Sequence, residues 1–339
     1  MEEKIDGIWS DLAQKIQCDS NHKENRIYRR LDLEKDNGIR LGVSIPGIKK
    51  ELLIELTDRG QHSFFDPKWA GLIITAIDLD IHQEKIPHLM LHILRQEHES
   101  VFLLVCADIV VTLINIVKPE HRARELNNCL DKWSRFFHKH GFDGLGIEAQ
   151  RGLFGEIYWM QRIINAGMNK NKAVNAWQGC SGAYHDYIYQ DGAVEVKTTI
   201  SKEPRKVKIN NERQLDDRVL EKMVLYVLSL QVLPSGGLTL PSLIEEIRFS
   251  LSDNMSAKIS FEQSLHEAGY IDSHEYIYKD NYIIKKEESF LVRDGFPRII
   301  DMPSGTGDLS YSVSISSCYD YLIDLNTATS LFNGGDNSA

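Results

Sequence analysis

The segment YHDYIYQDGAVEVKTT, residues 184–199, decides how the second half of this chain folds. Aromatic or apolar side chains recur at every second position before and after the dipeptide Asp191-Gly192. This alternation is typical of strands that bury one face, and Asp-Gly is a strong signal for a two-residue hairpin loop. We therefore predict antiparallel strands over 184–190 and 193–200, joined by Asp191-Gly192.

That loop also predicts the register of the hairpin, with Ile188 facing Glu195 and Asp186 facing Lys197. Cross-strand partners point to the same side of a sheet, and side chains alternate along each strand. Asp186, Glu195 and Lys197 are therefore expected to share one face. The opposite face, which can pack on the core, carries Tyr187, Tyr189, Val194 and Val196.

Two carboxylates and one ammonium on a single face indicate chemistry. As diagonal neighbours, Asp186 and Glu195 would have Cβ atoms roughly 7 Å apart, a gap that Mg²⁺ or a similar hard cation can bridge. Metal-assisted phosphodiester hydrolysis needs such a site, and Lys197 could hold or help deprotonate the attacking water. The alternative is a solvated strand face with an ordinary Glu–Lys pair, because such triplets are common by chance.

The preceding segment predicts a helix over 148–166 that carries a third carboxylate. Glu148, Gly152 and Glu156 are spaced by four and lie along one stripe. Glu156 borders the apolar face, and the alternative is an ordinary helix-surface carboxylate. Gly152 and Gly155 each cost about 1 kcal/mol of helix stability relative to Ala, so we expect them to allow close approach of a sheet or a ligand.

A basic stretch follows the hairpin, and we predict that it contacts a DNA backbone. Its members are Lys202, Arg205, Lys206, Lys208 and Arg213. Lys206 and Lys208 share a face of a short predicted strand, and the alternative is a solvated edge whose lysines discourage unwanted pairing. Gln214 could contact the water, the metal shell or DNA, or it is an ordinary surface residue. Trp177 is predicted to pack in the core, and the alternative is that it stacks on a base.

Composition limits the function classes. The chain has 339 residues, 42% of them hydrophobic and 26% charged, an ordinary globular mix. The net charge of −10 counts against simple coating of nucleic acid, which usually needs a basic surface, but it allows an enzyme with a local basic track.

The chain shows no sign of secretion or of a membrane anchor. Its start, MEEKIDGIWSDL, lacks an apolar signal region. The longest apolar run, 101–117, is interrupted by Asp108 and Thr112 and predicts a buried helix. Five scattered cysteines without a CxxC pair argue against disulfides and thiolate zinc, so a cytoplasmic location is expected.

We expect four regions along the chain. These are a strand-rich N-terminal module over 1–118, a helical connector over 119–146, a catalytic domain over 147–331 and a disordered tail over 332–339. In the first module we predict strands at 26–33, 39–43, 51–56, 71–77 and 88–94 and a helix at 100–117, and in the connector a helix at 120–140. After the hairpin we predict strands at 207–210, 222–232, 276–286 and 312–323, a short helix or turn at 211–217, and helices at 240–250 and 256–267.

At these residues the chain resembles the PD-(D/E)XK nuclease superfamily, the fold of many restriction endonucleases. The superfamily order of helix, strand, strand, helix, strand matches 148–166, 184–190, 193–200, 211–217 and 222–232. The resemblance implies an α+β or α/β fold with a restriction-endonuclease-like mixed sheet flanked by helices. It also implies that Asp186, Glu195, Lys197 and Glu156 are catalytic, and that the metal ligands are Asp186, Glu195, Val196 and Glu156. His185, in place of the superfamily's Pro, precedes Asp186.

The string RGLFGE, then Trp177, the EVKTT strand and a later Gln-Leu pair are similar to a bacterial branch that occurs with DNA-modification and phage-defence genes. The resemblance implies a Mg²⁺- or Mn²⁺-dependent endodeoxyribonuclease acting on DNA, expected to be double-stranded. It allows a homodimer and methyltransferase or ATPase companion subunits. The alternatives are a non-catalytic DNA-binding or scaffold subunit of a defence complex and an RNA-directed nuclease.

Overall fold

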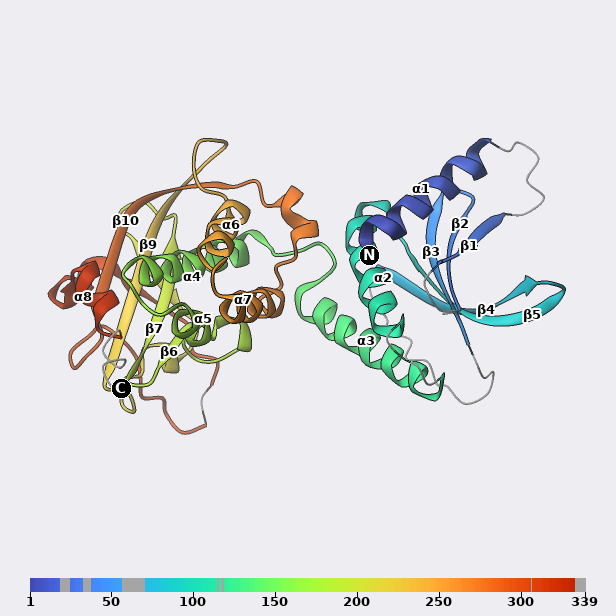
Figure 1. The fold of residues 1–339 in the computed structure, drawn as a ribbon. Helices are drawn as coiled ribbons and strands as arrows, with labels where there is room; N and C mark the ends of the chain where they lie inside the picture. Colours follow the sequence, from blue (N-terminus) through green and yellow to red (C-terminus); the bar gives the residue numbers. More distant parts are fainter. Residues whose placement is uncertain are drawn as a thin grey trace. The chain divides into compact units, whose positions relative to one another are not determined.

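The chain divides into two compact units, Met1–Gly144 and Leu145–Ala339. The computed structural model shown in Figure 1 describes residues 1–18, 25–32, 38–56, 71–114, 116, 119–305 and 307–332. Across these residues, no helix combines the length and apolarity that a membrane span requires.

The described residues of the first unit form an antiparallel sheet and the helices that pack with it. The sheet has the order β1-β2-β3-β5-β4. Its strands are β1 (Arg26–Arg30), β2 (Ile39–Ser44), β3 (Lys49–Glu55), β4 (Leu72–Ile81) and β5 (Glu84–Ile93). The helices are α1 (Glu2–Cys18), α2 (Glu99–Ile114) and α3 (Pro119–His140).

Two features of this unit differ from the sequence expectation. Helix α1 is not among the predicted helices, although its buried residues Ile5, Trp9, Leu12 and Ile16 recur at helical spacing. Helix α3 lies in the segment expected to connect the units, yet it packs on α2 within the first unit. Trp133 Nε1 donates a hydrogen bond of 2.8 Å to Asp108 Oδ2 of α2.

The second unit is built on a mixed sheet with the order β12-β10-β9-β7-β6. Its strands are β6 (Tyr187–Tyr189), β7 (Gly192–Thr199), β9 (Lys222–Leu233), β10 (Asn281–Leu291) and β12 (Leu322–Ile323). Strands β7 and β9 run parallel, whereas the other neighbours pair antiparallel. The run of β9 from Met223 to Leu230 is buried because layers cover both faces of the sheet.

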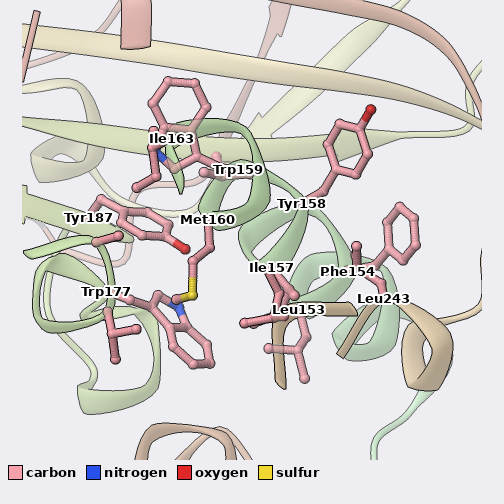
Figure 2. Close-up of a cluster of buried hydrophobic side chains, with 14 of the residues drawn as sticks. Leu153, Phe154, Ile157, Tyr158, Trp159, Met160, Ile163, Trp177, Tyr187 and Leu243 are labelled. Atoms are coloured by element: carbon pink, nitrogen blue, oxygen red, sulfur yellow. The ribbon is translucent and has the colours of Figure 1, made fainter. Parts of the chain in front are cut away.

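Helices cover one face of this sheet, as Figure 1 shows. They are α4 (Ile147–Asn165), α5 (Lys170–Ala176), α6 (Leu240–Ser250) and α7 (Met255–Glu267). The close-up in Figure 2 shows the apolar stripe of α4 against Trp177, Tyr187 and Leu243. Tyr187, Tyr189, Val194 and Val196 all belong to this core, which confirms the predicted inner face of the hairpin.

The other face is covered by a small two-stranded sheet and two 3-10 turns. The sheet pairs β8 (Lys206–Ile209) with β11 (Tyr311–Ser314), and the turns are η3 (Glu212–Leu215) and η5 (Ile315–Tyr321). Ala193, Leu225 and Val227 of the main sheet pack against this layer. The predicted mixed sheet flanked by helices is therefore confirmed, and the short helix or turn expected at 211–217 is the 3-10 turn η3.

The C-terminal hundred residues depart most from expectation. The strand predicted at 276–286 lies later, as β10, and the turn η4 (Asp272–Ile277) precedes it. The strand predicted at 312–323 is β11, then η5, then β12, followed by α8 (Leu325–Ser330). Phe332 does not belong to a tail, because its ring is buried and stacks on Tyr189 with ring centres 4.3 Å apart. Residues 333–339 lie outside the described residues.

The two glycines of α4 have different surroundings. A Cβ at Gly155 would lie 2.4 Å from Thr198 Cγ2, so α4 touches β7 at this point, as expected from the sequence. A Cβ at Gly152 would have no atom within 4 Å, so the expected approach of the sheet is absent there.

We predict opposite effects of Ala at these two positions. Gly155→Ala should lower the free energy of unfolding by about 1–2 kcal/mol, because the added methyl overpacks the helix–sheet contact. Gly152→Ala should raise it by about 0.5–1 kcal/mol through helix propensity alone. Urea denaturation of both variants tests this, and equal stabilisation by the two would contradict the close contact at Gly155.

Candidate active site

The register of the hairpin differs from the prediction by two residues. Tyr189 pairs with Gly192 and Tyr187 with Val194, so the two-residue loop is Gln190-Asp191 and Gly192 opens β7. The cause lies in the neighbouring strand. A Cβ at Gly192 would lie 2.1 Å from the carbonyl oxygen of Lys222, so β7 can pair with β9 only with glycine at this position. Gly192 is a strand residue that permits this close approach, and the prediction that it forms the turn is wrong.

The two-residue shift leaves each side chain of the hairpin on its predicted face but changes which residues face each other across the two strands. Continuing the observed pairs by one residue places Asp186 opposite Glu195, and no longer opposite Lys197. Asp186 Oδ2 accepts a hydrogen bond of 2.8 Å from the backbone N–H of Val196. Asp186, directly before β6, and Glu195 of β7 therefore face each other, closer than the diagonal that the sequence predicted.

Glu156 reaches the same place from α4. Its Oε2 accepts a hydrogen bond of 2.7 Å from Trp177 Nε1. Its main-chain carbonyl accepts another of 2.8 Å from the hydroxyl of Tyr187, one residue from Asp186. The charge of Asp186 acts on Glu156, which places the two carboxylates in one electrostatic cluster.

Lys197 contacts the carboxylate cluster through Glu195. Its Nζ lies 2.6 Å from Glu195 Oε1 and donates a hydrogen bond of 3.3 Å to Gln214 Oε1. The same amide oxygen accepts a hydrogen bond of 2.8 Å from the N–H of Asn210. Turn η3 thus brings Gln214 to the ammonium, in contact with the cluster that the hairpin and α4 form.

The site is buried and has an excess of negative charge. Burial raises the pKa of Glu195 well above its ordinary value, and the charge of Asp186 adds to this effect. Burial, reinforced by Asp186, raises the pKa of Glu156 to about 8 from 4.5. Burial also raises the pKa of Asp186, opposed mainly by the charge of Lys197. Three carboxylates therefore share one ammonium.

These residues fit a hard divalent cation. Glu195 is 1% exposed, and within the described part of the chain its Oε2 has no hydrogen-bond partner. An unpaired buried carboxylate oxygen is costly, and a cation would remove that cost. Oxygen donors with a negative excess are the ligands that Mg²⁺ and Mn²⁺ prefer.

Val196 can contribute only through its main chain, because its side chain is buried in the core on the helix side. Its N–H points to Asp186, on the β6 side of β7. The N–H and C=O of one strand residue point to the same edge, so the carbonyl of Val196 also faces β6. The sequence-predicted ligands Asp186, Glu195, Val196 and Glu156 thus come together from two strands and one helix.

A second acidic group lies in the first unit. Glu97, His98 and Asp143 hold ligand atoms within 4.8 Å of one another, and no other group of three does so among the residues described. Their carboxylate side chains are 60% and 79% exposed. The hairpin carboxylates are less tightly gathered, which suits Mg²⁺, an ion usually held by one or two carboxylates and several waters.

The basic residues divide into exposed and buried ones. Lys202 is exposed, and Lys206 and Lys208 share the exposed face of β8, opposite Ser314 and Ser312 of β11. Their surface is available to a phosphate backbone or to solvent, so both interpretations of the sequence stay open.

Arg213 lies beside the candidate site. It is exposed, and its guanidinium stacks on Tyr184 at 4.5 Å from the ring centre and donates to the Tyr184 hydroxyl. Tyr184 is two residues from Asp186, and Arg213 precedes Gln214. This cation is therefore held next to the carboxylates by an aromatic platform.

Arg205 is not available to DNA, which corrects the prediction. Its side chain is 10% exposed and forms an ion pair with Glu288. Its guanidinium also donates hydrogen bonds of 2.9 Å to Ser229 and 2.8 Å to the hydroxyl of Tyr319. These contacts join Arg205, which directly precedes β8, to β9 and β10.

Trp177 is 2% exposed and packs in the core, as predicted from the sequence. Its hydrogen bond to Glu156 was not predicted, because nothing local in the sequence links positions 21 residues apart.

The comparisons with known proteins give a family. A family model described as "Putative PD-(D/E)XK family member, (DUF4420)" matches residues 5–316 of the chain. The match extends over both units and agrees with the resemblance found from the hairpin and α4. The chain matches no curated protein and no solved structure.

We predict a pH-dependent effect of Glu156→Gln on stability without metal. Because the folded state raises this pKa from 4.5 to about 8, the contribution of Glu156 to stability is fully present below 4.5 and is lost as the pH rises to about 8. In EDTA, Glu156→Gln should match the wild type at about pH 4 and exceed it by about 3–5 kcal/mol above about pH 8, since one pKa unit corresponds to about 1.4 kcal/mol.

Chemical denaturation at both pH values measures this difference. Glu148→Gln is the matched control, because Glu148 lies exposed on the same helix, and it should show no such trend. A difference for Glu156→Gln that is the same at both pH values would contradict the raised pKa.

Proposed function

Because the chain belongs to the DUF4420 family of PD-(D/E)XK proteins, we propose that it is a Mg²⁺- or Mn²⁺-dependent endodeoxyribonuclease. The observation that carries the proposal is the buried pairing of Glu195 with Lys197, 2.6 Å apart, beside Asp186 and Glu156. An acidic pair with an adjacent ammonium serves metal-assisted hydrolysis of a phosphodiester by water.

The residues of the site divide into metal ligands, a residue that acts on the water and a residue that positions it. Asp186, Glu195, Glu156 and the carbonyl of Val196 hold the metal, which when bound neutralises the phosphate and orients the attacking water. Lys197 holds that water and helps to deprotonate it, because its positive charge stabilises the hydroxide that remains when the proton leaves to solvent. Gln214 keeps the Lys197 ammonium in place through its amide oxygen. The reaction needs no covalent intermediate on the protein.

DNA binding is proposed for the exposed cations around the site. Arg213 on its Tyr184 platform and the lysines of β8 can contact phosphates, which fix the position of a duplex without reading its sequence. Double-strand cleavage needs two sites, so we propose a homodimer. The branch similarity supports a role in restriction or phage defence, with methyltransferase or ATPase subunits as companions.

A cytoplasmic place of action fits the cysteines. Those whose side chains the structure describes, Cys18, Cys106, Cys129 and Cys318, are unpaired. Free thiols are typical of a reducing compartment.

The second candidate is a non-catalytic DNA-binding or scaffold subunit of a defence complex. The net charge of −10 favours it, because an acidic surface weakens independent capture of DNA. Lys197 separates the two candidates, since a scaffold has no use for an ammonium that acts on water.

We predict that Lys197→Met folds, binds DNA nearly as well as the wild type and loses cleavage by about 10²–10⁴-fold, as expected for removal of a proton-transfer group. The measurement is single-turnover cleavage beside DNA binding, with Mg²⁺ or EDTA and with methylated and unmethylated plasmid.

Lys222→Met is the matched control for this experiment. Lys222 also lies 2.6 Å from a carboxylate, Asp191, but at the loop end of the hairpin, so its loss should leave cleavage within a few-fold of the wild type. Wild-type cleavage that persists in Lys197→Met would remove Lys197 from the mechanism. Absence of wild-type cleavage with every metal, methylation state and companion subunit would favour the scaffold.

We also predict that changing Lys206 and Lys208 together to Ala weakens binding to all DNA sequences alike. The slope of log affinity against log salt should fall by about 1 for each DNA phosphate that these lysines neutralise in the wild type. The control changes Lys258 and Lys279, which lie outside β8. An unchanged slope for the β8 variant would show that these lysines do not contact phosphates and belong to a solvated strand edge.

A further inference from the structure

We infer that Trp177 is a positioning residue for the metal-binding carboxylates, and that the segment Trp177–Gly179 sets how Glu156 stands relative to Asp186. This inference rests on the proposed function, because it assigns the carboxylates to a metal. It starts from the contacts that one short segment makes with two separate elements, α4 and the beginning of β6.

The first contact is the indole hydrogen bond. Trp177 is 2% exposed, and its Nε1 donates to Glu156 Oε2 at 2.7 Å. The ring is held by packing, with Phe261 of α7 at 6.2 Å between ring centres. A buried ring has little freedom, so its N–H fixes one oxygen of the Glu156 carboxylate and leaves the other for a ligand.

The second set of contacts holds Asp186 through its main chain. The N–H groups of Gln178 and Gly179 both donate to the carbonyl oxygen of Asp186, at 2.7 and 3.1 Å. Trp177 also forms an isolated bridge with Tyr187. The same three residues therefore bind α4 through a side chain and the start of β6 through the backbone, which couples the positions of the two carboxylates.

Gly179 supplies the space that this arrangement needs. A Cβ at position 179 would lie 2.2 Å from Glu156 Oε2. The clash would involve the end of a flexible side chain and no backbone atom, so an added methyl would move the carboxylate and leave the fold intact. Glycine at this position keeps Glu156 turned toward Trp177.

The choice of donor matters chemically. Trp offers a neutral N–H and no acceptor, whereas Lys or Arg would bring a positive charge. A cationic partner would neutralise Glu156 and compete with a metal. An indole orients the carboxylate and leaves its charge for a divalent cation, as hydrogen-bonding residues around metal ligands commonly do.

The test compares two buried tryptophans of the core on the helix side of the sheet. Trp177→Phe keeps the aromatic packing and removes the N–H that reaches Glu156. Trp159→Phe removes an N–H of the same kind, because Trp159 is 0% exposed and its Nε1 donates to the hydroxyl of Tyr189 at 3.4 Å. Calorimetric titration with Mn²⁺ should show affinity about tenfold or more weaker in Trp177→Phe, and nearly unchanged in Trp159→Phe.

A spectroscopic signature adds a readout that packing alone would not change. In the full chain with ¹⁵N-labelled tryptophan, addition of Mg²⁺ should shift the indole N–H resonance of Trp177, because its carboxylate partner takes up the ion. The resonance of Trp159 should stay in place. The two Phe variants assign these resonances.

Gly179→Ala keeps the test decisive should Trp177→Phe fail to fold. The added methyl displaces Glu156 while the indole remains, so Mn²⁺ affinity should fall to a similar extent. Equal Mn²⁺ affinity in the wild type, Trp177→Phe and Gly179→Ala would overturn the positioning role and leave the metal site standing. A wild type that binds no Mn²⁺ would overturn the proposed function, and this inference with it.

Discussion

The close approach of β7 to β9 at Gly192 is the constraint on which the candidate site depends. A side chain there would meet the Lys222 carbonyl at 2.1 Å, so the glycine enters the strand and the hairpin loop moves to Gln190-Asp191. Asp186 is thereby brought opposite Glu195. One backbone contact between two parallel strands thus decides which carboxylates become neighbours.

Burying these neighbouring carboxylates lowers the stability of the fold unless a cation balances their negative charge. Glu195 is buried with an unpartnered oxygen, and both it and Glu156 have pKa values raised by burial and by nearby negative charge. Lys197 offsets only part of this charge. A fold that retains such a cluster gives up stability for function, and a divalent cation is the partner whose charge and oxygen preference match it.

Much of this was predictable from local sequence, and the rest depends on distant residues. Alternation in the EVK strand indicates the shared face of Asp186, Glu195 and Lys197, and that face is present because a two-residue shift preserves it. The register itself was mispredicted, since Gly192 serves a contact with β9 that no hairpin rule contains. The sequence places Arg205 in a basic stretch and so predicts a DNA contact. Its partner, Glu288, lies 83 residues away, so no local pattern reveals the ion pair.

The same division explains the remaining misses. Helix α1 carries its apolar stripe in the sequence and could have been found by periodicity. Phe332 could not, because a polar, Gly-rich segment follows it in the sequence and its stacking partner, Tyr189, is far away along the chain. The link from Trp177 to Glu156 also joins separate elements, so only the fold reveals it.

A crystal structure of the protein soaked with Mn²⁺, with the metal located by its anomalous scattering, tests the central claim most directly. We expect a peak bounded by the carboxylates of Asp186 and Glu195, with Glu156 beside it, and its loss in Asp186→Asn. A peak at Glu97, His98 and Asp143 alone, or none near the hairpin, would contradict the assignment of this cluster to a metal.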